Sequence, residues 1–152
     1  VARLEAACLQ VFHAADAPSP PRNAWQRLQA DPQRLAATRL RLHPACAWLA
    51  CTHAAVDLWQ AHMRAESMES ADLAGIDPDH AQDALLWRDG DGLVQVAALP
   101  PGCAAALDAL QAGAALLPVL SRLPGDAAAT LLAHLAGDGV VTDILVPTVE
   151  AT

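Results

Sequence analysis

The fold is decided by one stretch, Leu85-Leu86-Trp87-Arg88-Asp89-Gly90-Asp91-Gly92-Leu93-Val94-Gln95-Val96. Two apolar runs flank an Asp/Gly turn, and glycine readily adopts the positive backbone angles that tight hairpin turns require. This pattern predicts a β-hairpin. Three Ala/Leu-rich segments follow, and each ends at Gly or Pro. A hairpin followed by three compact helices is typical of a winged-helix-like module, which we place at residues 84–146.

The segments after the hairpin carry start and stop signals of short helices. Gly113 is expected to close the first helix, and Pro118 must lie in the first turn of the second. Asp126 is expected to cap the third helix. The three helices and a last strand are expected at residues 102–112, 115–122, 127–136 and 140–146.

The residues before the hairpin alternate between helical and extended patterns. Apolar residues at three- and four-residue steps predict an amphipathic helix from Val1 to Phe12, which three prolines end. A linker follows, in which Trp25 is expected to be partly exposed. A short helix, an edge strand, a second helix and an acidic loop are expected at residues 33–38, 39–42, 56–63 and 66–83. The loop is expected to contain a helical turn at Pro78–Asp83, and the nature of residues 45–51 stays open.

Together these elements predict an α+β fold with a small antiparallel sheet, a winged-helix-like C-terminal half and a helical N-terminal part. With 152 residues the chain can bury one good core or two small ones. We expect a helical N-terminal segment and linker over residues 1–38. A mixed α+β domain over residues 39–152 is expected to contain the winged-helix-like module.

The charge of the chain limits the classes of partner. The formal net charge is −8 and the isoelectric point is near 4.9, which disfavours autonomous DNA binding because such binding relies on cationic side chains. All nine basic residues are arginines. Arg34, Arg39 and Arg41 lie close together and could form a local patch, whereas only Arg88 and Arg122 fall in the winged-helix-like module.

No motif in the sequence points to catalysis or to a cofactor. The spacing of the four cysteines fits neither a zinc pair nor a disulfide framework, so reduced and mostly buried thiols are expected. The densest set of metal-ligating side chains is His43, Cys46, Cys51 and His53. An extended segment could bring them together, although partly buried residues flanking a strand are the simpler interpretation. Without an export signal or a long apolar run, the chain is expected in the cytoplasm.

Five sequence runs carry a resemblance to a known family. They are Val1-Ala2-Arg3-Leu4-Glu5, Phe12-His13-Ala14-Ala15-Asp16, Leu40-Arg41-Leu42-His43-Pro44, Val56-Asp57-Leu58-Trp59-Gln60-Ala61-His62 and Leu86-Trp87-Arg88-Asp89-Gly90. In this order they resemble the C-terminal region of HvfC/BufC-type proteins, often described as DNA-binding domain proteins, over about residues 1–136. Members of that family carry a helical N-terminal domain ahead of this region, which we expect to be missing from this chain.

The resemblance implies a non-catalytic partner role in the maturation of ribosomally made peptides. Such proteins accompany multinuclear-iron oxygenases of the HvfB/BufB or methanobactin type. They help to present a precursor peptide whose cysteines are modified for copper handling. The resemblance transfers no catalytic residue to this chain. A winged-helix-like regulatory domain that binds DNA is the alternative function, and an independent enzyme is third.

The hairpin and its helices also resemble the PqqD-like recognition module. There a leader peptide adds as a strand to the sheet edge and packs against the last helix, a mode that needs no positive charge. The expected edge is Leu93–Ala98. The candidate residues for binding a peptide or partner are Leu93, Val94, Gln95, Val96, Leu131 and His134. Two simpler interpretations stay open, namely that Leu131 and Leu135 belong to the core and that the hairpin is paired on both edges.

Overall fold

A computed structural model describes residues 1–65 and 72–148 and shows an α+β fold. The helices in these ranges are Ala2–His13 (α1), Arg22–Gln29 (α2), Pro32–Ala37 (α3), Ala55–Arg64 (α4), Cys103–Gln111 (α5), Leu116–Leu120 (α6) and Gly125–Gly137 (α7). The strands are Arg39–Leu42 (β1), Cys46–Cys51 (β2), Gln82–Arg88 (β3), Val94–Leu99 (β4) and Val141–Leu145 (β5). None of the described helices is both long and apolar enough to span a bilayer.

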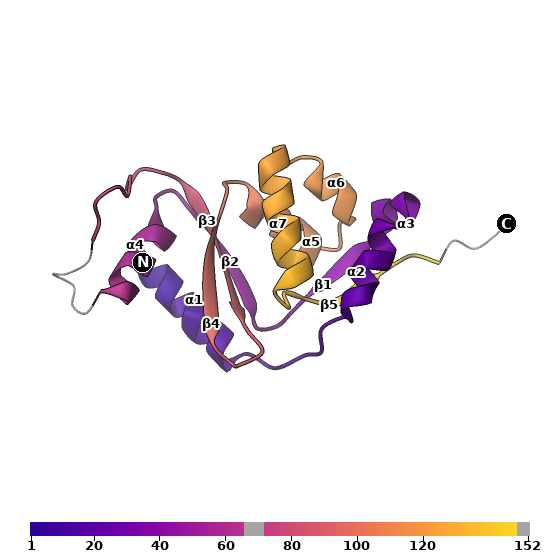
Figure 1. Cartoon of the computed structure of the whole chain (residues 1–152), viewed down its shortest axis with the longest axis horizontal. Helices are drawn as coiled ribbons and strands as arrows, with labels where there is room; N and C mark the ends of the chain where they lie inside the picture. Colours follow the sequence, from indigo (N-terminus) through magenta and orange to yellow (C-terminus); the bar gives the residue numbers. More distant parts are fainter. Residues whose placement is uncertain (66–71, 149–152) are drawn as a thin grey trace.

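The central strand β3 is covered on both of its faces. It lies between β2 and β4 in an antiparallel sheet, with Leu85 opposite Trp48 on one side and Ala97 on the other. Because successive side chains of a strand point to opposite faces, Leu85 joins a core with α5 and α7. Ala84 and Leu86 join a second core with α1 and α4. Figure 1 shows these two pairs of helices on either side of the sheet.

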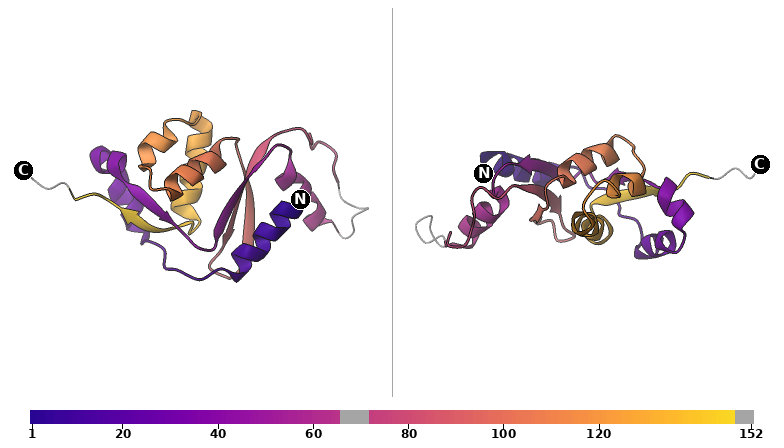
Figure 2. Two further views of the ribbon diagram at one scale, coloured as in Figure 1. Left: turned by 180° about the vertical axis from the view of Figure 1, so that it is seen from behind. Right: turned by 90° about the horizontal axis from the view of Figure 1, so that it is seen from above.

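A second antiparallel sheet consists of β1 and β5 and extends the first core. Leu40 of β1 and Val141 of β5 are buried in the same cluster as Leu85. Helices α2 and α3 pack at this end of the molecule, far from α1 and α4 (Figure 2). The last strand therefore pairs with β1 and not with the hairpin, although the two paired segments are about 100 positions apart in the chain.

The hairpin turn has the geometry that its sequence predicts. Gly92 has a φ of 82°, a conformation in which glycine avoids the strain of a side chain. The Asp89 carboxylate accepts hydrogen bonds from the backbone N–H groups of Asp91 and Leu93 at 3.0 and 2.9 Å. The hairpin and the α+β class are confirmed, while the winged-helix-like arrangement stays a prediction.

Trp25 corrects the expected linker. It lies in helix α2 and is only 7 % exposed, packed in the first core together with Leu28. Pro21 precedes the helix, a place where proline is well tolerated because the first N–H groups of a helix need no partner inside it. The linker is therefore shorter than expected: residues 14–21 have no regular secondary structure, and Pro21 directly precedes α2.

Two further local predictions are wrong. The range Pro78–Asp83, where a helical turn is expected, ends in strand β3: Gln82 pairs with β2, and Asp83 pairs with both β2 and β4. Asp126 does not cap α7: the helix already begins at Gly125, after Pro124, and no side chain accepts a capping hydrogen bond there. Part of the expected acidic loop, residues 66–71, lies outside the described residues.

Replacement of Leu85 by Ala tests the two-sided burial of β3. The side chain is fully buried, so Leu85→Ala is expected to lower the free energy of unfolding by about 2–5 kcal/mol. Leu117 is 40 % exposed, and Leu117→Ala serves as a matched control. Leu117→Ala is expected to lower the free energy of unfolding much less than Leu85→Ala does. Urea unfolding followed by Trp fluorescence measures both, and equal losses would contradict this account of the core.

Candidate functional site

Strand β4 is an edge of the three-stranded sheet. The N–H of Asp89 donates to the carbonyl oxygen of Leu93 at 2.9 Å, which sets the phase of the antiparallel ladder. Because hydrogen-bonded pairs alternate along such a ladder, Gln95 and Ala97 bond to β3. Val94, Val96 and Ala98 therefore direct their backbone N–H and C=O groups away from the sheet.

One side chain blocks part of this open edge. The Gln60 Nε2 group of α4 donates to the Val96 carbonyl oxygen at 3.0 Å. Arg64, one turn further along α4, donates to the Gln60 Oε1 atom at 3.1 Å and orients the amide. Within residues 1–65 and 72–148, no other hydrogen bond reaches the outward backbone groups of Val94, Val96 and Ala98. A rotation of the Gln60 side chain would free the whole edge.

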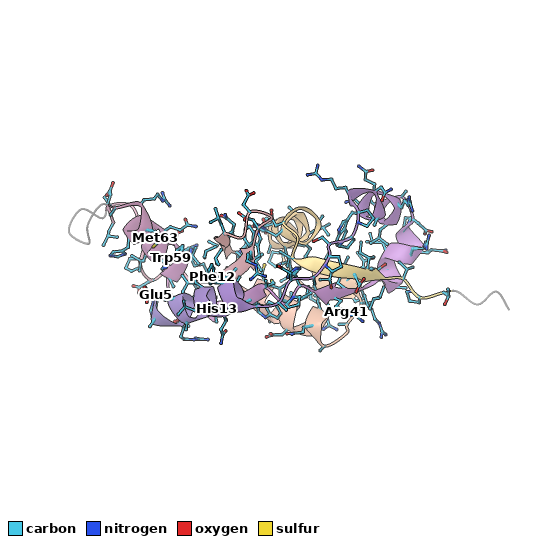
Figure 3. The ribbon with its side chains drawn as sticks, turned by 90° about the horizontal axis from the view of Figure 1, so that it is seen from below. Glu5, Phe12, His13, Arg41, Trp59 and Met63 are labelled. Atoms are coloured by element: carbon cyan, nitrogen blue, oxygen red, sulfur yellow. The ribbon has the colours of Figure 1, made fainter. Side chains whose placement is uncertain are left out.

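Two large apolar side chains on segments that adjoin or contact β4 are exposed. Leu93, in the turn before β4, is 61 % exposed, and Met63 of α4 is 66 % exposed. Both α4 and α7 contact β4, from opposite faces of the sheet. Figure 3 shows Met63 and Trp59 of α4 at the end of the molecule where Glu5 of α1 also lies. An extended segment added to β4 would therefore run between two helices.

The six candidate residues are divided between this edge and the core. Val94 and Val96 pack partly against the second core, and Gln95 on the opposite face donates to the Asp89 carboxylate at 2.7 Å. Leu131 is fully buried in the first core and offers no surface to a partner, and the same holds for Leu135.

His134 does reach the Gln95 face of the sheet. Its ring lies 5.5 Å from that of Trp87, the residue directly opposite Gln95, and its Nδ1 atom is hydrogen bonded to the Asp138 carboxylate. Five of the six candidate residues thus lie in or next to the first half of β4, namely Leu93, Val94, Gln95, Val96 and His134.

Residues from three of the five sequence runs named above, 12–16, 40–44 and 86–90, come together elsewhere, around the segment 14–21. A cavity of about 530 Å³ lies here, and its lining includes Asp16, His43, Trp87, Arg88 and Asp89. The Arg88 Nη1 group donates to the carbonyl oxygens of Val11 and Phe12 at 3.1 and 2.7 Å. Its Nη2 group donates to Asp16 at 2.6 Å. Arg88 thereby satisfies the free carbonyls at the C-terminal end of α1.

His43 fixes the same segment from the other side. The backbone N–H of Ala45 donates to His43 Nδ1 at 2.9 Å, so the ring proton resides on Nε2. Nε2 then donates to the carbonyl oxygen of Ala17 at 2.9 Å. Both motif residues bond mainly to backbone groups, which indicates that they hold α1 and the following segment against the end of the hairpin.

The cysteine and histidine set at residues 43–53 does not converge. Cys46 packs toward the first core and Cys51 toward the second, because they lie on opposite faces of β2. His53 is exposed and lies 3.7 Å from Asp79. Among the described residues, no three His, Cys, Asp or Glu side chains are grouped so that they could hold a metal ion. Burial raises the pKa of the Cys46 thiol to about 12, which keeps it protonated at neutral pH.

Sequence reasoning missed Gln60 and Asp16. Gln60 belongs to a run that carries the resemblance, yet nothing local shows that its amide reaches a strand 36 positions later. Comparison of the chain with protein-family models, curated proteins and solved structures gives no match.

Replacement of Arg88 by Gln tests whether its hydrogen bonds hold α1 against the sheet. The Arg88 side chain is 11 % exposed and its guanidinium group donates to two backbone carbonyls, so Arg88→Gln is expected to lower the free energy of unfolding by about 1.5–3 kcal/mol. Asp16→Asn removes only the charge of an exposed partner and is expected to cost about 0–1 kcal/mol. Chemical unfolding measures both changes. If Asp16→Asn lowers the free energy of unfolding as much as Arg88→Gln does, the hydrogen bonds of Arg88 to the backbone are not the main contribution.

The thiols predict a loss of stability at alkaline pH. Burial raises the pKa of Cys46 from 9.0 to about 12 and, together with Asp83 and Asp126, raises that of Cys103 to about 11. Above pH 9 the unfolded chain loses these protons while the folded chain keeps them. The free energy of unfolding is therefore expected to fall as the pH rises from 9 toward 11.

The chain suits this measurement because it has neither Lys nor Tyr, whose side chains would titrate in the same window. Urea unfolding in the presence of a reductant, at a series of pH values, gives the slope of the free energy of unfolding against pH. Cys46→Ser is expected to make the slope shallower. An unchanged slope in that variant would show that Cys46 does not carry the effect.

Proposed function

We propose that this chain is a non-catalytic recognition subunit that binds an extended peptide as an additional strand at the β4 edge. The observation that carries the proposal is the row of outward backbone groups at Val94, Val96 and Ala98, of which only one carbonyl has a partner in the described residues. Strand addition uses such groups for affinity and side-chain pockets for specificity. Leu93, directly before β4, and Met63 of α4, a helix that contacts β4, are exposed apolar side chains.

The opposite edge of the sheet is less suitable. Helix α5 contacts β2, and the Trp48 indole donates to Asp108 of α5 at 2.8 Å. The β4 edge, like β2, contains no charged residue and no proline, here between Leu93 and Leu99. Charges and prolines are the usual devices that prevent another strand from pairing, and β4 lacks both.

The proposed peptide is the ribosomally made precursor of an iron-dependent modifying oxygenase of the HvfB/BufB type, with the oxygenase as the second partner. This part of the proposal rests on the sequence resemblance, as does a cytoplasmic location. DNA binding through a winged-helix-like module has weaker support, because α7 contains neither Arg nor Lys and the net charge is −8.

Two exposed alanines allow a matched test of the edge. Ala98 on β4 and Ala50 on β2 both direct their N–H groups away from β3, so proline at either position removes no hydrogen bond of the ladder. Ala98→Pro is expected to weaken binding of a fluorescein-labelled precursor peptide from the same operon by about tenfold or more. This follows because an inter-strand bond is lost and the ring projects into the site. Ala50→Pro is expected to leave the affinity unchanged.

Fluorescence anisotropy measures the affinities, and far-ultraviolet circular dichroism verifies that both variants fold. Peptide addition is also expected to slow the exchange of the Val94, Val96 and Ala98 amide protons in the unmodified chain. Equal affinities of the two variants, with no slowed exchange on β4, would overturn the proposal. Binding of a DNA duplex at low salt without any peptide binding would support the alternative function.

A further inference from the structure

The basic residues of this acidic chain are concentrated at one end of the molecule. Five of the nine arginines fall within residues 22–41, a range that contains a single carboxylate, Asp31. This range forms α2, α3 and β1, which lie at the opposite end from α1 and α4 (Figure 1). The end that carries α2 and α3 is therefore locally positive on a chain whose net charge is −8.

Among the described residues, only Arg41 of these five arginines forms an ion pair with a carboxylate. Arg41 pairs with Asp143 at 3.0 Å. In the ranges that the structure describes, no carboxylate forms an ion pair with Arg27 or Arg34. Asp31 lies between these two arginines in the sequence, but its carboxylate accepts the backbone N–H groups of Gln33 and Arg34 at 3.2 Å and caps α3. The Asp31 carboxylate is thus occupied by backbone groups.

Arg27 and Arg34 line one small cavity, which we call the Arg27–Arg34 pocket. Its volume is about 200 Å³, and its remaining lining residues are Ala24, Leu28, Ile144 and Val146. Both arginines are exposed, whereas Leu28 is buried and Ile144 is partly buried. The pocket therefore combines an apolar floor with two guanidinium groups. It is smaller than the roughly 300–1,000 Å³ of most small-molecule sites and suits a single side chain.

We propose that the Arg27–Arg34 pocket binds a carboxylate side chain of an acidic and partly apolar peptide segment on a partner protein. A guanidinium group presents its N–H donors in a planar fork that matches a carboxylate. The apolar floor contacts the methylene groups of the bound side chain or an aliphatic neighbour. Nucleic acid is the less favoured partner, because phosphate binding draws on many cations and gains nothing from an apolar floor.

This site is separate from the β4 edge. It is formed by α2, α3 and the end of β5, whereas the edge belongs to the other sheet. The pocket can therefore hold a partner while a peptide occupies β4. A failure of the peptide proposal would leave this one standing, and the reverse also holds.

The test uses a fluorescein-labelled octapeptide of alternating Glu and Leu, its Gln/Leu counterpart and a short DNA duplex as probes. The Glu peptide is expected to bind more tightly than the Gln peptide and to weaken with added salt. The double variant Arg27→Gln/Arg34→Gln is expected to lose about tenfold or more in affinity, since two charge-assisted contacts disappear. Both side chains are exposed, so the fold is expected to tolerate the change.

Arg122→Gln is the matched control, because Arg122 is exposed and lies after α6, outside the pocket. It is expected to change the affinity by less than about twofold. Ala98→Pro is expected to leave binding of the Glu peptide unchanged. Equal binding of the Glu and Gln peptides, or an equal loss in the Arg122→Gln control, would overturn the proposal. Tighter binding of the DNA duplex that is lost in the double variant would assign the pocket to nucleic acid instead.

Discussion

The burial of β3 on both faces is the constraint on which the rest of the structure depends. Leu85 on one face and Leu86 on the other are both fully buried, so each face needs its own cover of helices. The chain supplies α1 and α4 for one face and α5 and α7 for the other. With all its covering helices on the faces, the sheet keeps a free edge at β4.

The burial of β3 also explains the hydrogen bonds of Arg88, which help to hold α1 against the sheet. Helix α1 comes far earlier in the sequence than β3, and its three buried side chains, Leu4, Ala7 and Val11, provide a narrow contact. Arg88 adds polar contacts at the C-terminal end of that helix, where free carbonyls need donors. His43 fixes the next segment through Ala17. Arg88 and His43 thus help to hold α1 and the following segment over the sheet, and the proposed peptide-binding edge lies elsewhere.

The sequence predicts those parts of the fold that are determined by neighbouring residues. The Asp89–Gly92 turn, the short helix α3 and the helices on either side of Gly113 are local, and the structure confirms them. The pairing of Leu40 with Ile144 is not local, so no pattern in either strand reveals it. For the site, the sequence places Val94 and Val96 on an edge strand correctly. It cannot separate the buried Leu131 from the partly exposed His134, because both lie on one face of α7.

An apolar edge strand normally invites pairing with a second copy of the same chain. Two features oppose this outcome here. Two copies that each carry a net charge of −8 repel each other at separations up to about the Debye length. In addition, the Gln60 amide donates a hydrogen bond to the Val96 carbonyl oxygen and so covers part of the edge. A short peptide of low charge meets little of that repulsion and needs to displace only one amide. The same acidity that weakens the case for DNA therefore makes an open edge compatible with a peptide partner and unfavourable for self-association.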